Sequence, residues 1–200
     1  MLSIIPRLSR IRDTKTLEQY AADYCNCSGL SIPTTYLQSK NNRVFGVFWQ
    51  RQLVGGFILG ADSDFRTLHC FARPEAHDEL LSKMGEASQY AEITCFFIQS
   101  QYRTITWLNL YVWLALTFCI RIYGRQGLLF GTNSPSLAKL YGQTHHSRPF
   151  HKDRIGKKRT FLFLATRRQS VKGMLEIIRH KLQRSRELKK AAARRSMATH

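Results

Sequence analysis

Acidic residues are scarce in this chain of 200 residues, which has 13 Asp and Glu against 31 Lys and Arg and a formal net charge of +18. The positive excess is concentrated near the C-terminus, because residues 151–200 hold 16 Lys and Arg against 3 Asp and Glu. Such a field favours anionic partners: nucleic acid, anionic lipid headgroups or a phosphorylated cofactor. Charge alone does not select one of them.

The cysteines are also few, five in all, and they lack the spacing of a metal or redox motif. One residue separates Cys25 from Cys27, whereas zinc knuckles and thioredoxin-like redox sites typically have two. Three of the five cysteines lie inside apolar runs, where a small buried thiol packs well. We therefore expect reduced thiols with structural or incidental roles.

A secretory signal is missing from the N-terminus, since residues 1–13 (MLSIIPRLSRIRD) contain no sufficiently long apolar segment. Together with the reduced thiols, this predicts a cytoplasmic protein.

Charged residues are absent from the 17 positions between Thr104 and Ile120. A run of this length is at the lower limit for crossing a bilayer. Asn109 and the threonines of this run favour a buried or interface helix over a membrane span. A helix that is apolar on all sides has more surface than one sheet covers, so a second protomer, another protein or a membrane surface is expected to cover the rest.

The most informative part of the chain is an ordered series of elements between Tyr90 and Gln143. The pattern predicts a strand over 90–98, a turn over 99–104, an apolar helix over 105–124, a strand over 127–131 and a helix capped by Ser134 and begun by Pro135. Such a βαβα unit places two strands in parallel, with the first helix beginning where the first strand ends. The free N–H groups of that helix face a crevice that suits an anionic ligand.

At these residues the chain resembles the GNAT superfamily of N-acyltransferases. The resemblance is carried by AEITCFFI, by the turn Tyr102-Arg103-Thr104 and by the stretch from Asn133 to Tyr141, which is similar to the family's N-x-x-(S/A)-x-x-x-Y helix with one extra residue. The stretch 43–60 looks like the family's central hairpin, and RTFLFLATRR, from Arg159, like its closing strand. The resemblance implies an α/β fold with a mixed central sheet flanked by helices over residues 1–166, followed by a basic C-terminal helix over 167–200.

The resemblance also implies a reaction, the transfer of an acyl group from acetyl-CoA or another acyl-CoA to an amine. Its catalytic residues would be Glu92 as the general base and Tyr141 as the general acid that protonates the leaving thiolate. Its coenzyme contacts would be Ile98, Arg103, Thr104 and Asn133.

Two glycines of the family's pyrophosphate-binding turn are replaced here by Thr106 and Leu108. Glycine allows the backbone to approach a phosphate closely, so their absence supports a second interpretation, a non-catalytic binding or assembly protein. Glu92 has an alternative role as a structural carboxylate, and Tyr141 as a core residue of an apolar helical face.

Two other segments carry weaker signals. Residues 61–89 are read as an insertion with a short strand, RTLHCF, and a helix begun by Pro74. Gly55 and Gly56 indicate a β-bulge or a close backbone approach. His145, His146 and His151 suit a metal, but they lie in a polar, basic segment that we interpret as a solvated loop, with no metal site.

The C-terminal stretch reads as a basic amphipathic helix, whose apolar face comprises Val171, Met174, Leu175, Ile178 and Leu182. This face can dock on the domain; otherwise the helix can lie on an anionic membrane or contact phosphates. The chain contains no motif that recognises nucleic-acid bases, so any nucleic-acid binding would not depend on the base sequence. Past Gln183 the apolar stripe thins, and a frayed tail is expected.

Overall fold

The computed structural model describes residues 5–61, 64–144, 148–155 and 157–198. The elements of the first half are β1 (Arg7–Ile11), α1 (Thr14–Ser28), α2 (Thr34–Gln38), β2 (Asn42–Trp49), β3 (Gln52–Gly60), α3 (Arg66–Phe71) and α4 (Pro74–Met84). Those of the second half are β4 (Tyr90–Ile98), α5 (Thr106–Tyr123), β5 (Gly127–Thr132), α6 (Pro135–Thr144), β6 (His151–Ile155), β7 (Lys158–Thr166) and α7 (Arg167–Ala198). Short 3-10 turns at Ala87–Gln89 and Ser100–Tyr102 flank β4.

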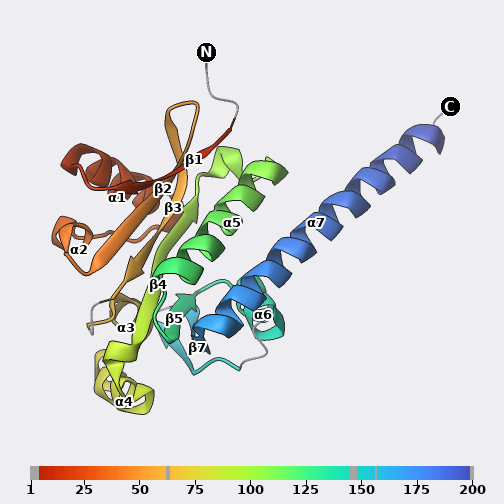
Figure 1. Cartoon of the computed structure of the whole chain (residues 1–200). Coiled ribbons are helices and arrows are strands. Elements are labelled where there is room, and N and C mark those ends of the chain that lie inside the picture. Colours follow the sequence, from red (N-terminus) through yellow and green to blue (C-terminus); the bar gives the residue numbers. More distant parts are fainter. Residues whose placement is uncertain (1–4, 62–63, 145–147, 156, 199–200) are drawn as a thin grey trace.

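The strands form a seven-stranded mixed sheet in the order β1-β2-β3-β4-β5-β7-β6 (Figure 1). The β4–β5 pair is parallel, and the other neighbouring pairs are antiparallel. This confirms the predicted mixed sheet flanked by helices, with the predicted hairpin as β2 and β3 and the closing strand as β7.

Helices cover both faces of this sheet (Figure 1). One face carries α5, α6 and α7, whose apolar residues share a core with Phe45, Phe57 and Phe163 of the strands. The other face carries α1 and α2 over the β2–β4 region and α3 and α4 over β5 and β7. The sheet is therefore the middle layer of three, with one helical layer on each of its faces.

The βαβα unit predicted between Tyr90 and Gln143 is confirmed. Its first strand ends at Ile98, α5 begins at Thr106, and β5 returns in parallel with β4. The hydroxyl of Ser134 accepts a hydrogen bond from the Leu137 N–H at 3.4 Å, so Ser134 is the predicted N-cap of α6.

The predicted strand in residues 61–89 is wrong, because RTLHCF forms the helix α3. Tertiary contacts decide the conformation here. The carboxylate of Glu92 accepts hydrogen bonds from the Arg66 and Thr67 N–H groups at the start of the helix, while Phe65 and Leu68 are fully buried against α4, β5 and β7. The helix begun by Pro74 is confirmed as α4.

The loop predicted before the closing strand is also wrong in part. Residues 151–155 form the edge strand β6, which pairs with β7 in an antiparallel register. Its side chains are exposed or half-buried, so the segment lacks the alternation of apolar and polar residues from which strands are usually predicted. Asp153 anchors the strand to the insertion, because its carboxylate accepts a hydrogen bond from Arg73 Nε at 2.7 Å.

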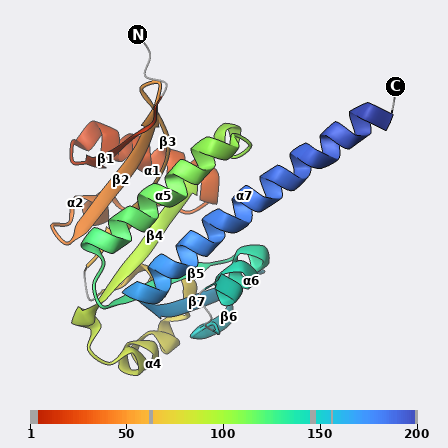
Figure 2. The same ribbon diagram turned by 45° about the vertical axis from the view of Figure 1, so that its right-hand side comes forward.

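The C-terminal helix α7 follows β7 directly and continues to Ala198. The helix is thus longer than expected, since we predicted a frayed tail past Gln183. It runs antiparallel to α5 and lies between α5 and α6 (Figure 2). Met174, Ile177 and Ile178 are buried, whereas Leu175 and Leu182 are 50% and 40% exposed. The predicted apolar face is therefore divided, and its two leucines remain at the surface.

Helix α5 satisfies the length and composition expected of a membrane span. Half of its residues are nevertheless buried, packed on the sheet and against α7. In this fold α5 is a core helix with one solvent-exposed side, as the interpretation of a buried or interface helix predicts.

Candidate functional site

A cavity opens where the two parallel strands separate. Tyr90–Ile93 of β4 pair with Gly127–Phe130 of β5, and the pairing stops there, although β4 continues to Ile98 and β5 to Thr132. The space between the diverging strand ends is about 630 Å³, within the usual range for small-molecule sites.

A β-bulge in β4 lies at this point of divergence. Phe57 of β3 faces two residues of β4, Cys95 and Phe96, because the register shifts between the pairs Ile58–Thr94 and Gly56–Phe97. Cys95 has a φ of 51°, and its carbonyl oxygen accepts a hydrogen bond from the Tyr20 hydroxyl at 2.9 Å. A bulge bends the strand and leaves a residue outside the ladder, and both residues of this bulge, Cys95 and Phe96, line the cavity.

The glycines opposite this bulge allow strand and helix to approach closely. A Cβ atom at Gly55 would lie 2.7 Å from the Phe97 carbonyl oxygen, and one at Gly56 would lie 2.5 Å from the Tyr20 ring. The β3 strand is itself irregular beside Gly55, because its register with β2 shifts between the pairs Val47–Gly55 and Phe48–Leu53. Both interpretations of this pair, a bulge and a close approach, are therefore confirmed.

The cavity passes between β4 and β5 and is lined from both helical layers. Cys27, Leu30 and Thr67 belong to the layer of α1–α4, and Trp113 and Leu137 to the layer of α5–α7. The cavity is thus bounded by side chains from both faces of the sheet.

The electrostatic character of the cavity is positive. Arg103, Lys158 and Lys181 line it, and no carboxylate does so among the described residues. The N-terminal end of α5, which has no side-chain cap, lies beside the cavity at Asn109, whereas α6 begins at Pro135, which has no N–H, and its Leu137 N–H is capped by Ser134. The site therefore suits a ligand with an apolar part and negative charge.

Three of the four predicted coenzyme contacts come together at the cavity. Ile98, Arg103 and Asn133 line it, and Arg103 Nε donates a hydrogen bond to the Ile98 carbonyl oxygen at 2.8 Å. Thr104 is exposed and lies outside the lining residues. The coenzyme-binding roles of these residues stay predictions.

The two replaced glycine positions do not obstruct the cavity. Leu108 is fully buried in the core beneath α5, and Thr106 is an exposed residue of the first helical turn. Neither residue lines the cavity. The side chains there anchor the helix to the sheet or face solvent, so the space between the strands stays open.

Tyr141 of α6, the predicted general acid, lies in the cavity wall. Its ring packs edge-on against Phe130, with centroids 5.2 Å apart, and against Phe163. Burial raises the pKa of the Tyr141 phenol above its ordinary value, so the hydroxyl keeps its proton at neutral pH. Its acid role stays a prediction, and its contacts fit both that role and the core alternative.

Glu92, the predicted general base, is not among the residues that line the cavity. Its side chain is fully buried, and its carboxylate accepts hydrogen bonds from the Tyr36 hydroxyl, from the Arg66 N–H at 3.2 Å and from the Thr67 N–H and hydroxyl, both at 2.8 Å. Burial raises the pKa of Glu92, while these donors act in the opposite direction. The catalytic role is untested, and the contacts favour the structural alternative.

Sequence reasoning missed several residues of the site. Lys181 of α7 is half-buried in the cavity wall, with its ammonium 5.6 Å from the centroid of the Trp113 ring. Burial lowers its pKa, and the charge of Arg184 adds to this effect. Asn109 lines the cavity with a buried Oδ1 that has no hydrogen-bond partner in the described part of the chain. The sequence placed Lys181 in a basic helix and Asn109 in an apolar one, but gave no sign that both helices meet at one cavity.

The histidines that we expected in a solvated loop, with no metal site, are described only in part. His145 and His146 lie outside the described residues, and His151 Nε2 lies 3.8 Å from the carboxylate of Asp153 on β6. A different group, Asp64, His69 and His77, has ligand atoms within 4.8 Å of one another. Two of its members are exposed, and none lines the cavity.

A mixed sheet whose one parallel pair splays around a cavity, with a helix crossing between the two strands, defines the GNAT N-acyltransferase fold. Solved structures agree. The CoA-dependent acyl-homoserine lactone synthase MesI has a TM-score of 0.60 at 12% identity, over 86% of this chain and 95% of its own. FeeM, an N-acyl amino acid synthase from uncultured soil microbes, has a TM-score of 0.59 at 14% identity, over 82% and 92%. The ribosomal-protein-S18-alanine N-acetyltransferase from Escherichia coli has 0.53 at 8%, over 81% and 94%.

No protein-family model matches the chain, and no curated protein matches it in sequence. At the identities of the solved structures, the likeness establishes the fold.

Proposed function

We propose that this chain is an N-acyltransferase that uses an acyl-CoA as its donor. The observation that carries the proposal is the cavity itself, which passes through the sheet at the divergence of β4 and β5 and is lined by three cations and no described carboxylate. An acyl thioester of coenzyme A has the matching parts: an apolar chain, an extended amide-containing arm and phosphates. A non-catalytic assembly protein would not need an open, positively charged cavity, so the cavity favours the enzyme over this alternative.

The negative end of the donor fits the layer of α5–α7. Lys181 and Arg103 supply charge, while the uncapped first turn of α5 supplies backbone N–H groups. This arrangement takes the place of the glycine-rich turn that the sequence lacks. The acceptor amine would enter from the layer of α1–α4, past Cys27 and Thr67.

The chemistry proposed here follows from the groups at the strand ends. The amine nitrogen bonds to the thioester carbon, the C–S bond breaks, and the leaving thiolate takes the phenolic proton of Tyr141. The proton lost by the amine passes to solvent, from which the phenol recovers one. A backbone N–H that the bulge at Cys95 and Phe96 leaves outside the ladder can donate a hydrogen bond to the carbonyl oxygen as it gains negative charge.

Solved structures support this choice among reactions. One neighbour is described as a CoA-dependent synthase and another as an N-acyl amino acid synthase. Both descriptions fit acyl transfer, and the second specifies a bond to nitrogen. Neither identifies the acceptor or the acyl chain of this protein.

Filling the cavity tests the proposal directly. Leu137 is a half-buried residue of α6 in the cavity wall, so Leu137→Trp should occupy the space of the donor and weaken acyl-CoA binding by at least about tenfold, or 1.4 kcal/mol. Calorimetric titration with acetyl-CoA and with a longer acyl-CoA measures the effect. Lys139→Trp, an exposed change on the same helix, is the control. Failure of the unmodified protein to bind either donor at millimolar concentration would contradict the proposal.

Removing the cation of α7 provides a second prediction. Lys181→Gln should weaken CoA binding by about tenfold, because a hydrogen bond to a charged group contributes about 1.5–3 kcal/mol. Pantetheine, which lacks the phosphates, should bind both proteins equally. Lys172→Gln removes the same charge from an exposed position of α7 outside the cavity and should bind CoA normally. Equal CoA affinity in all three proteins would exclude Lys181 as a phosphate contact.

A further inference from the structure

An exposed apolar stripe runs along the side of α5 that faces neither the sheet nor α7. It consists of Trp107, Leu114, Phe118 and Ile122, which are exposed, and the half-buried Tyr111. These positions recur every three or four residues and so share one side of the helix. Phe118 is 57% exposed, a high value for an aromatic ring in an ordered helix.

The apolar surface continues beyond α5 on both sides. Ile5 and Leu8 share a surface hollow with Tyr111, Leu114 and Phe118. On the other side, Leu175 of α7 lies in a hollow with Arg121 of α5. In the described part of the chain, every large hydrophobic residue classed as exposed lies on α5, on α7 or at Ile5. We call the surface formed by the stripe on α5 together with Ile5, Leu8 and Leu175 the α5 face.

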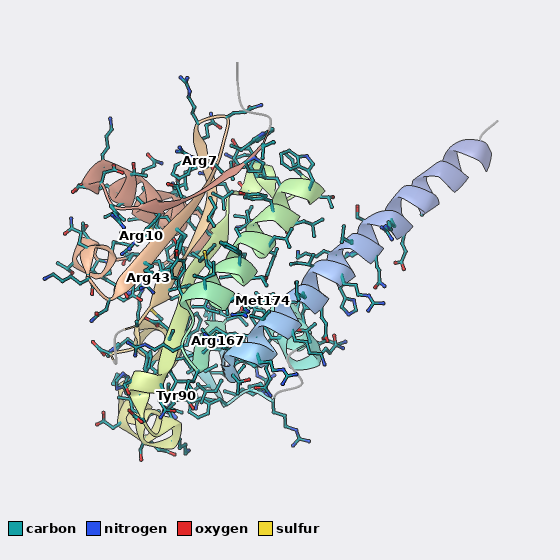
Figure 3. The ribbon with its side chains drawn as sticks, viewed as in Figure 1. Arg7, Arg10, Arg43, Tyr90, Arg167 and Met174 are labelled. Atoms are coloured by element: carbon teal, nitrogen blue, oxygen red, sulfur yellow. The ribbon has the colours of Figure 1, made fainter. Side chains whose placement is uncertain are left out.

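Arginines and lysines border the α5 face on two sides. Arg43 lies over the ring of Tyr123, 4.8 Å from its centroid, and Arg10 is close enough to Arg43 and Arg12 for their charges to lower its pKa, after the larger effect of burial. The beginning of α7 supplies the other border with Arg167, Arg168 and Lys172, which line the same hollow as Leu175 and Arg121. Figure 3 labels Arg10 on β1, Arg43 on β2 and Arg167 at the start of α7.

None of these bordering cations has a carboxylate within 4 Å among the described residues, where the ion pairs of arginine and lysine are Arg73–Asp153 and Lys83–Glu79. The positive charge on the α5 face is thus left for a partner.

Charge complementarity selects the partner. In a symmetric dimer built on the α5 face, the arginines of one copy would meet those of the other, and like charges across an interface oppose association. Duplex DNA would match the charge, but it offers nothing to the stripe of tryptophan, phenylalanine and leucine. An anionic membrane surface satisfies both parts, because apolar side chains enter the acyl region while arginines contact headgroup phosphates.

We propose that the α5 face binds the surface of an anionic membrane, with α5 lying parallel to it. The helix remains part of the folded core, since its opposite side packs on the sheet, so binding is peripheral. The proposal goes beyond the acyl-transfer activity and does not depend on it.

Vesicle flotation with the full chain tests the proposal. The protein should float with vesicles of phosphatidylcholine and phosphatidylglycerol, and about tenfold less with phosphatidylcholine alone, because each surface cation contributes about 1 kcal/mol on an anionic bilayer. Leu114→Glu/Phe118→Glu should lower binding to the anionic vesicles by at least about tenfold. Ala22→Glu/Asn26→Glu places the same charges at the same spacing on an exposed side of α1, across the sheet, and should bind normally.

Several outcomes would overturn the proposal. One is failure of the unmodified protein to float with anionic vesicles, and another is equal binding by the two double variants. A dimer that dissociates in the Leu114→Glu/Phe118→Glu variant, without vesicle binding by the unmodified protein, would assign the α5 face to a second copy. Salt-sensitive DNA binding without vesicle binding would assign it to nucleic acid. Circular dichroism of both variants verifies that each is folded.

Discussion

Replacing Glu92 with alanine is expected to lower the free energy of unfolding by about 3–5 kcal/mol, since each buried donor left unpaired costs about 1–3 kcal/mol. The change removes the acceptor of the Tyr36 and Thr67 hydroxyls and of the first N–H groups of α3. Helix α3 should loosen, and with it the cavity wall to which Thr67 contributes. Urea unfolding followed by circular dichroism measures the effect.

Glu92→Gln separates the structural role from the catalytic one. Glutamine keeps the shape of the side chain but presents one oxygen in place of two, so we expect a smaller loss of stability and nearly normal turnover. The opposite result, an unchanged unfolding midpoint with turnover reduced by about 100-fold or more, would restore Glu92 as the general base.

Replacing Tyr141 with phenylalanine is expected to reduce turnover by about 100-fold, the lower end of what a positioned general acid contributes. The affinity for the acyl-CoA should stay within about twofold, because the ring keeps its contacts with Phe130 and Phe163. Steady-state kinetics with an acceptor found by screening, together with calorimetry for the donor, give both quantities.

Tyr24→Phe is the matched control for this experiment. Tyr24 also lines the cavity and also has its pKa raised by burial, but it belongs to α1 on the other face of the sheet. Loss of its hydroxyl should leave turnover almost unchanged. If Tyr141→Phe behaves in the same way, the phenol of Tyr141 is a packing group and the thiolate is protonated by another donor.

The part of the fold that the sequence predicted best is the part with strong local signals. The strand from Tyr90 to Ile98, the uncharged helix after it and the Ser134-Pro135 helix start each show their structure within a few residues. Their order then implies a parallel pair, and the cavity follows from that topology. Ile98, Arg103, Asn133 and Tyr141, which the resemblance to the GNAT superfamily selected, lie at this cavity.

The sequence did not predict the elements whose conformation depends on contacts with distant residues. RTLHCF becomes helical because Glu92, more than 20 residues later, accepts its first N–H groups, and no local pattern records that contact. His151–Ile155 becomes a strand because β7 offers a free edge to a polar segment. Lys181 reaches the cavity only because α7 turns back antiparallel to α5, a direction that helical periodicity alone cannot give.

The passage of the cavity through the sheet has a consequence for the order of events in the proposed reaction. Since the proposed donor and acceptor would enter from opposite faces of the sheet, neither must leave before the other arrives. Burial raises the pKa of the thiols that line the cavity, that of Cys95 to about 11 and that of Cys27 in the same direction, so neither is a ready nucleophile for a covalent acyl-enzyme. Initial-rate lines at several fixed acceptor concentrations should therefore intersect, as direct transfer within a ternary complex requires, whereas a ping-pong enzyme would give parallel lines.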